Sequence, residues 1–217
     1  MLHALTVDEI GESHVSSSVD TPLRADAFEL SDGEKIRVLS HHFYRIMQTL
    51  GLDMTDDSLS GTPQRIAKMY VQEIFRGLNP ENKPAISLFE NKYEYKDIVL
   101  EKDITLYSYC EHHFVPIIGK AHVAYCANGH VIGLSKINRL VQYYASRPQV
   151  QERLTLQIAD GLKEAIQTED VAVMIEASHL CVAARGIKDT ASTTITNHFS
   201  GRFLQEKTQQ LFLSMIK

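Results

Sequence analysis

The 217-residue sequence contains no tryptophan, only three cysteines, and no apolar run approaching the roughly 18–20 residues that span a bilayer. Three cysteines are too few, and odd in number, for a disulfide framework, which favours a reducing compartment. The first nine residues lack both a basic region and a sustained apolar segment, so we expect no signal peptide. These absences predict a soluble cytoplasmic protein with no membrane partner.

The net charge is also close to zero over most of the chain. The formal net charge is −5, but residues 1–32 contain seven acidic side chains and a single arginine. The remaining residues therefore carry 21 basic and 20 acidic side chains, which is close to neutral. Because nucleic-acid binding needs a basic stripe, we do not expect a nucleic-acid partner.

The N-terminal part reads as an arm followed by helices. Residues 1–30 are acidic and polar, and we expect a mobile arm. Residues 31–99 form a helical N-terminal extension in our interpretation. Ser31 and Glu34 have capping-box spacing before a helical apolar pattern that ends at Gly51. A second helix is predicted at Thr62, with this residue as the N-cap, and residues 78–99 resemble a loop.

Residues 100–217 have a different pattern and form the expected catalytic region of the same structural unit. Apolar residues alternate in four segments and recur at helical spacing in three others. The predicted order is strand, strand, helix, helix, strand, strand, closing helix. These elements are predicted at 103–109, 119–126, after Ser135, from Arg147, 171–181, 190–198 and 203–216.

The strongest chemical signal is a Cys-x-x-His turn with a distant third partner. Cys110 and His113 can chelate one ion from a tight bend, and Cys181 follows 71 residues later. If the strand continues to Cys181, His179 and Cys181 lie on one face at its end. Thiolate and imidazole together suit Zn²⁺. The alternative is that the cysteines are core residues and the histidines ordinary surface residues.

The number of available ligands bears on the type of site. A structural zinc needs four protein ligands, whereas a catalytic zinc keeps one position open for water. Cys126 has no metal-competent neighbour and is predicted to be core, which leaves three good ligands. His112 and His179 remain as candidates for acid–base chemistry, because their ordinary pKa lies near neutrality. This arrangement favours a hydrolytic site.

A second candidate site lies where a helix begins near residue 134. Its free backbone N–H groups would bind phosphate, and Lys136 and Arg139 share a face of that helix. Arg185 follows Cys181 closely enough to reach a common pocket. Gln151 and Glu152 fall in the first turn of the next helix, where a carboxylate would suit a purine edge. All these residues are also common at helix ends for reasons of capping and solvation alone.

The chain resembles the zinc-dependent GTP cyclohydrolase I family of bacteria and animals over about residues 32–217. Several long motifs in the family's order are more specific than any single pattern. They are Thr62-Pro-Gln-Arg-Ile-Ala-Lys-Met-Tyr, Cys110-Glu-His-His-Phe-Val-Pro, Gly133-Leu-Ser-Lys-Ile-Asn-Arg, Arg147-Pro-Gln-Val-Gln-Glu-Arg-Leu and His179-Leu-Cys-Val-Ala-Ala-Arg-Gly.

The resemblance implies an α+β T-fold, a ββααββ antiparallel sheet with helices on one face, preceded here by the N-terminal helical extension. It also implies a toroidal homodecamer with active sites at subunit interfaces. Such an enzyme uses a zinc-activated water to attack guanine C8 of GTP. The products are 7,8-dihydroneopterin triphosphate and formate, in the first step of tetrahydrofolate and pterin biosynthesis.

The resemblance also implies a role for each matching residue. Proton transfer would fall to His112 and His179. The zinc ligands would be Cys110, His113 and Cys181. The guanine edge would be held by Glu152, Gln151 and the Leu134 backbone, and the triphosphate by Ser135, Lys136, Arg139, Arg185, Arg65 and Lys68.

Three alternatives compete with this interpretation. Another T-fold pterin or deazapurine enzyme would use three histidines on zinc or a cysteine nucleophile without metal. A nucleotide-binding or scaffold protein with structural zinc would need a fourth protein ligand. A zinc deaminase would carry His-x-Glu and Pro-Cys-x-x-Cys motifs, which this sequence lacks.

Overall fold

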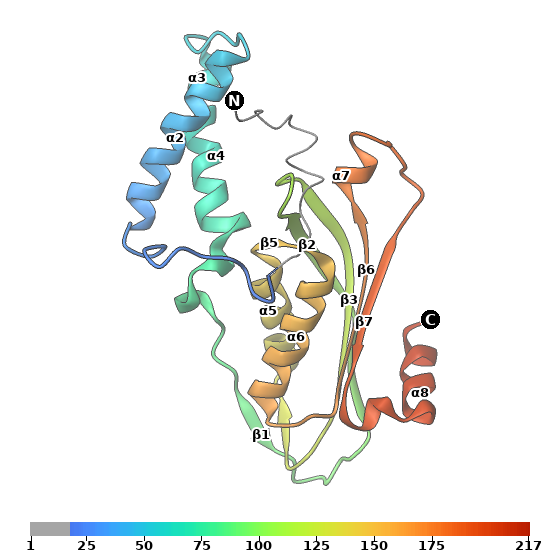
Figure 1. Ribbon diagram of the computed structural model, residues 1–217. Helices are drawn as coiled ribbons and strands as arrows, with labels where there is room; N and C mark the ends of the chain where they lie inside the picture. The colour runs from blue at the N-terminus through green and yellow to red at the C-terminus, as the bar shows by residue number, and fades with distance from the viewer. Residues whose placement is uncertain (1–17) are drawn as a thin grey trace, which may run out of the picture.

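The computed structural model describes residues 18–217 (Figure 1). We expected residues 1–30 to form a mobile arm, and residues 1–17 of this segment lie outside the described residues. The segment that follows runs without helix or strand to the first described helix. Its beginning contacts the body of the protein, because Arg153 donates to the Ser18 carbonyl and Arg147 lies 3.6 Å from the Asp20 carboxylate.

Helix α2 (Asp32–Thr49) begins at the predicted capping box. The Ser31 hydroxyl accepts from the Glu34 amide, and the Glu34 carboxylate accepts from the Ser31 amide at 2.9 Å. Helix α4 (Thr62–Met69) instead has Gly61 as its N-cap, so the predicted cap at Thr62 is wrong by one residue. The Thr62 hydroxyl accepts from the Arg65 guanidinium at 2.9 Å rather than from a backbone amide.

The helical hairpin of α2 and α4 projects from one end of the sheet, with α3 (Asp57–Ser60) between them (Figure 1). Aromatic side chains join it to the rest of the molecule. The ring of Phe75 lies 5.0 Å from that of Phe114 and 5.8 Å from that of Tyr109, between centroids. The stretch predicted as loop contains β1 (Leu88–Glu90), which pairs with β4 (His130–Ile132), in addition to short helical turns.

The predicted ββααββ order is confirmed, and five strands form one sheet in the order β5-β2-β3-β6-β7. All neighbours are antiparallel except β2 and β5. The segment at Pro148 was expected to begin a helix, but it forms β5, and α6 begins after Val150. The elements are β2 (Ile98–Cys110), β3 (Pro116–Cys126), α5 (Leu134–Ala145), β5 (Pro148–Gln149), α6 (Gln151–Ile166), β6 (Val171–His179) and β7 (Thr194–Phe199).

Each face of the sheet has its own apolar cluster. Helices α5 and α6 cover one face, where Leu106, Ile117 and Leu154 are buried in the main core. The closing helix α8 (Glu206–Ile216) covers part of the other face through Phe212, and Cys126 is buried there as predicted. None of the helices in the described part of the chain is long and apolar enough to cross a membrane.

The last strand before the third cysteine is shorter than predicted. Strand β6 ends at His179, and the chain turns into α7 (Leu180–Ala183), so Cys181 lies on a helical turn rather than on the strand. The final ladder pair joins His179 to Ile117. The next position of β3 is Pro116, which has no N–H to continue the ladder. The prediction that Cys181 continues the strand face is therefore wrong.

Candidate active site

Three metal-competent side chains meet at the end of the sheet where β2 and β6 finish. The ligand atoms of Cys110, His113 and Cys181 all lie within 4.8 Å of one another. Cys110 ends β2, and its carbonyl accepts from the Phe114 amide at 2.9 Å, which closes the turn that contains His113. Among the described residues this group has three members, so it offers no fourth protein ligand.

The two thiols influence one another electrostatically. Burial raises the pKa of the Cys181 thiol, and the neighbouring Cys110 thiol raises it further, because two thiolates side by side repel. A bound dication would stabilise both thiolates and remove this penalty. The distance from His113 Nδ1 to Cys110 Sγ is 3.8 Å. The donor set of two sulfurs and one imidazole nitrogen therefore fits zinc.

His179 lies beside this group, and its ring forms a hydrogen bond with the side chain of Gln151. The distance from His179 Nε2 to Gln151 Oε1 is 2.8 Å. Burial of the half-exposed ring lowers its pKa, and the nearby Glu152 carboxylate opposes that shift. Glu152 itself is exposed in the first turn of α6, as expected for a group that meets a ligand.

His112 has a support that sequence reasoning missed. Its Nε2 lies 3.7 Å from Glu111 Oε1, and the other oxygen of that carboxylate accepts from Arg153. The Arg153 side chain is buried and also donates to Gln149 Oε1 at 3.0 Å and to the Pro148 carbonyl at 2.9 Å. The available signal was one acidic and one basic residue in two separate motifs, 42 residues apart, and nothing in this spacing indicated that they pair or are buried. Glu111 and Arg153 thus form the buried base of the turn that presents His112.

Arg185 is the one predicted phosphate ligand that lies at the metal group. Its Nη1 is 3.0 Å from His113 Nε2, and its side chain is exposed. Arg65, in contrast, lies in the projecting hairpin, where its guanidinium donates to the Ser58 carbonyl and to Thr62. Lys68 is one turn further along the same helix.

The other predicted phosphate residues lie at the opposite end of the sheet. Helix α5 begins there, and its far end reaches the metal end, where the Ala145 carbonyl accepts from Ser108 of β2 at 2.8 Å. A helix of 12 residues is about 18 Å long. Within one chain the metal group is therefore separated by about the length of α5 from Leu134, Ser135 and Lys136, whereas Arg139 lies near the middle of that helix.

The beginning of α5 has no side-chain cap, and the Lys136 amide donates to the Gly133 carbonyl at 2.7 Å. The N-cap of this helix is Gly133, which has no side chain to accept from the first amides, and Ser135 is the second helical residue rather than a cap. Leu134 and Ser135 are exposed and Lys136 is half-buried. A helix N-terminus of this kind can bind an anion, and the metal-competent group found among residues 18–217 lies elsewhere.

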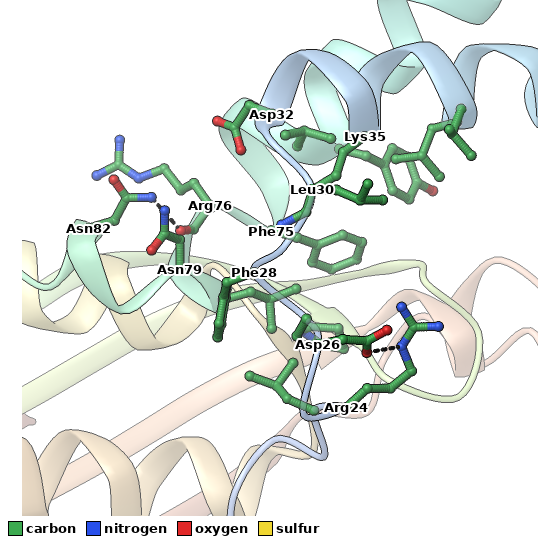
Figure 2. A pocket seen from close by; sticks show the side chains of 18 of the residues that line it. Arg24, Asp26, Phe28, Leu30, Asp32, Lys35, Phe75, Arg76, Asn79 and Asn82 are labelled. Carbon is green, nitrogen blue, oxygen red and sulfur yellow. Dashed lines mark hydrogen bonds and ion pairs between the residues drawn. The ribbon is translucent and has the colours of Figure 1, made fainter.

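A separate apolar cavity of about 440 Å³ lies between residues 23–30, α2 and the aromatic side chains that follow α4 (Figure 2). Phe114 lines it from the metal end. Arg24 and Asp26 form an ion pair at 3.0 Å on its rim. Its lining includes none of the predicted site residues. The cavity is therefore distinct from the candidate active site.

Comparisons with known proteins agree on one family. The model of the GTP cyclohydrolase I family matches residues 39–217. GTP cyclohydrolase 1 of Flavobacterium johnsoniae is 57% identical over 211 residues, covering 97% of this chain and 95% of the relative. GTP cyclohydrolase 1 of Citrobacter koseri is 51% identical over 209 residues, covering 96% of this chain and 94% of the relative.

Proposed function

This chain belongs to the GTP cyclohydrolase I family, and from that premise we propose how its own residues carry the reaction. The reaction converts GTP and water to 7,8-dihydroneopterin triphosphate and formate. The observation that carries the proposal is the meeting of Cys110, His113 and Cys181 within 4.8 Å at the end of the sheet that also holds two further histidines.

Cys110, His113 and Cys181 would hold Zn²⁺. When bound, the ion supplies Lewis acidity and lowers the pKa of a coordinated water, which hydrolysis at guanine C8 needs near neutral pH. Both thiols must be reduced to serve as ligands. The three cysteines of the chain are all unpaired, which supports a cytoplasmic location.

His112 and His179 would transfer protons while the imidazole ring of guanine opens and the ribose rearranges. Both steps require protons to be added and removed at nitrogen and oxygen atoms, which imidazole does well near neutral pH. The half-buried environment lowers the pKa of His179, which favours the neutral ring as a proton acceptor. The Glu111–Arg153 pair would hold His112 in place.

Glu152 would select guanine over adenine. Its exposed carboxylate accepts hydrogen bonds, and guanine offers the N1–H and the 2-amino group as donors. The Leu134 backbone would be a further partner of the guanine. Adenine presents an acceptor at N1, so its pairing with the carboxylate is repulsive. A site built for a donor rejects a ligand that lacks it by large factors.

The triphosphate would be bound by a second copy of the chain. In one chain Arg185 lies at the metal group, but Ser135 and Lys136 lie about the length of α5 away, and Arg139 is near the middle of that helix. Packing of copies around a ring, with the metal end of one against the α5 end of the next, would unite the two sets. Arg65 and Lys68 would complete the phosphate site from the projecting hairpins. The homodecamer of the family resemblance provides such interfaces.

Incubation of the zinc-loaded protein with GTP tests the proposal directly. We expect formate and, after oxidation, fluorescent pterin in equal amounts, and both products to disappear when a chelator removes the metal. ATP in place of GTP is the matched control and should give neither product. Formation of formate without pterin would show ring opening without cyclisation and would contradict the proposed function.

A further inference from the structure

The amide of Gln151 is fixed in one orientation by its surroundings. The side chain is only 1% exposed. Its Nε2 lies 3.2 Å from the Ile175 carbonyl oxygen and 3.0 Å from the Thr194 carbonyl oxygen. A carbonyl oxygen can only accept a hydrogen bond, so the –NH₂ group must face these two strands. The amide oxygen of Gln151 consequently faces the opposite way.

Two threonines reinforce this orientation. Thr155 donates its single hydroxyl proton to the Gln151 backbone carbonyl at 2.9 Å. The hydroxyl oxygens of Thr155 and Thr196 are 2.7 Å apart, and with the Thr155 proton on the Gln151 carbonyl it is Thr196 that donates to Thr155. Thr196 Oγ1 then has a lone pair available for Gln151 Nε2, which lies 3.1 Å away. The two protons of the –NH₂ group thus face three oxygen acceptors, which favours this orientation of the amide.

The fixed amide determines the protonation of His179. Gln151 Oε1 lies 2.8 Å from His179 Nε2, and an amide oxygen can only accept. His179 Nε2 must therefore carry a hydrogen. In the neutral imidazole the other nitrogen, Nδ1, is then the acceptor.

We propose that Gln151 is a positioning residue that fixes His179 in the Nε2–H tautomer and leaves Nδ1 as the nitrogen that accepts the substrate proton. The inference rests on the proposed function, because it takes His179 as a proton-transfer group. It moves Gln151 from the guanine edge to the support of His179, since both ends of its amide are already engaged inside the fold. Glu152 alone then reads the guanine donors through a side chain.

Solid-state ¹⁵N NMR of the whole protein labelled at histidine measures the tautomer. The His179 signals are assigned by their loss in a His179→Asn variant. In the wild type at pH 8, with and without zinc, we expect a protonated Nε2 and an unprotonated Nδ1. A protonated Nδ1 in the wild type would overturn the proposal, and this measurement needs no Gln151 variant to fold.

Gln151→Met removes the acceptor with little change in side-chain length. We expect both tautomers of His179 to appear, and kcat to fall by about 10–100-fold, as for other orienting partners. KM for GTP and zinc content should stay unchanged. Thr196→Val leaves both carbonyl acceptors in place, so the Nε2–H tautomer should persist.

Gln142→Met is the matched control, because Gln142 on α5 donates to the Thr105 carbonyl of β2, away from both histidines. Its kcat should equal that of the wild type. A Gln151→Met enzyme with wild-type kcat, or with a raised KM and an unchanged tautomer, would contradict the positioning role. Wild-type protein that produces no pterin from GTP would refute the proposed function instead, while the NMR result would still stand as a separate measurement.

Discussion

The two ends of the sheet are built in different ways. At the metal end, catalytic candidates rest on buried groups: Gln151 supports His179, and the Glu111–Arg153 pair supports His112. At the other end, the start of α5 presents exposed residues and has no side-chain cap or comparable scaffold. The difference agrees with the proposal that one chain would prepare the chemistry, whereas another copy would complete the phosphate site.

The largest expected effect comes from the metal group itself. Cys181→Ala removes one of two thiolates, so we expect zinc to be lost and production of formate and pterin to stop. Metal analysis of the purified variant, together with the GTP assay, measures both. Cys126→Ala is the control, because Cys126 is buried on the other face of the sheet and should retain zinc and activity. Retention of full zinc by Cys181→Ala would contradict its place in the group.

His112→Ala separates proton transfer from metal binding. We expect turnover to fall by about 10²–10⁴-fold, the usual range for loss of a general acid or base. Zinc content should remain at one per chain, since Cys110, His113 and Cys181 are intact. Equal loss of zinc in His112→Ala and Cys181→Ala would show that the two roles are not divided as proposed.

Arg153→Met tests whether the metal end depends on its buried scaffold. The variant leaves the largely buried Glu111 carboxylate without its cation, and removing one partner of such a pair costs about 3–5 kcal/mol of unfolding free energy. Chemical denaturation of the zinc-loaded protein measures this. Lys136→Met is the matched control at the other end and should change stability by less than about 0.5 kcal/mol, as for most surface substitutions. Similar losses in both variants would erase the contrast between the two ends.

The smallest expected effect lies at the start of α5. Lys136→Ala removes one charged donor to phosphate, which is worth about 1.5–3 kcal/mol and therefore raises KM for GTP by about 10–100-fold. Zinc content should not change, because the metal group lies at the far end of the sheet. A steady-state assay over a range of GTP concentrations distinguishes this result from a fall in kcat alone, which would place Lys136 in the chemical step.

The sequence patterns predicted the ββααββ order, and they predicted that Cys110, His113 and Cys181 form one group. Two of these ligands could be predicted locally, because a Cys-x-x-His turn holds Cys110 and His113 close together. The patterns did not predict that the chain leaves the strand after His179. Leu180-Cys-Val-Ala contains no glycine or proline, and the ladder ends where the neighbouring strand β3 begins, at Pro116, which has no N–H to donate. Such a constraint depends on register between segments far apart in the sequence.

The buried charges and the role of Gln151 were equally hidden in the sequence. Glu111 and Arg153 are 42 residues apart, and charged side chains are predicted to be exposed unless a partner is known. The family resemblance implies a guanine contact for both Gln151 and Glu152, but successive helix positions point in different directions. Its side chain is directed into the sheet while that of Glu152 is exposed. Only the tertiary structure separates the two roles.

The central claim is that the active site combines the metal end of one chain with the α5 end of another. It is tested most directly by mixing two inactive variants, Cys181→Ala and a Ser135→Ala/Lys136→Ala/Arg139→Ala triple variant, after dissociation and reassembly. If the site is shared, random assembly restores about a quarter of the wild-type activity, because that fraction of interfaces pairs two intact halves. A mixture that stays as inactive as its components, although it co-assembles, would show that each chain builds its site alone.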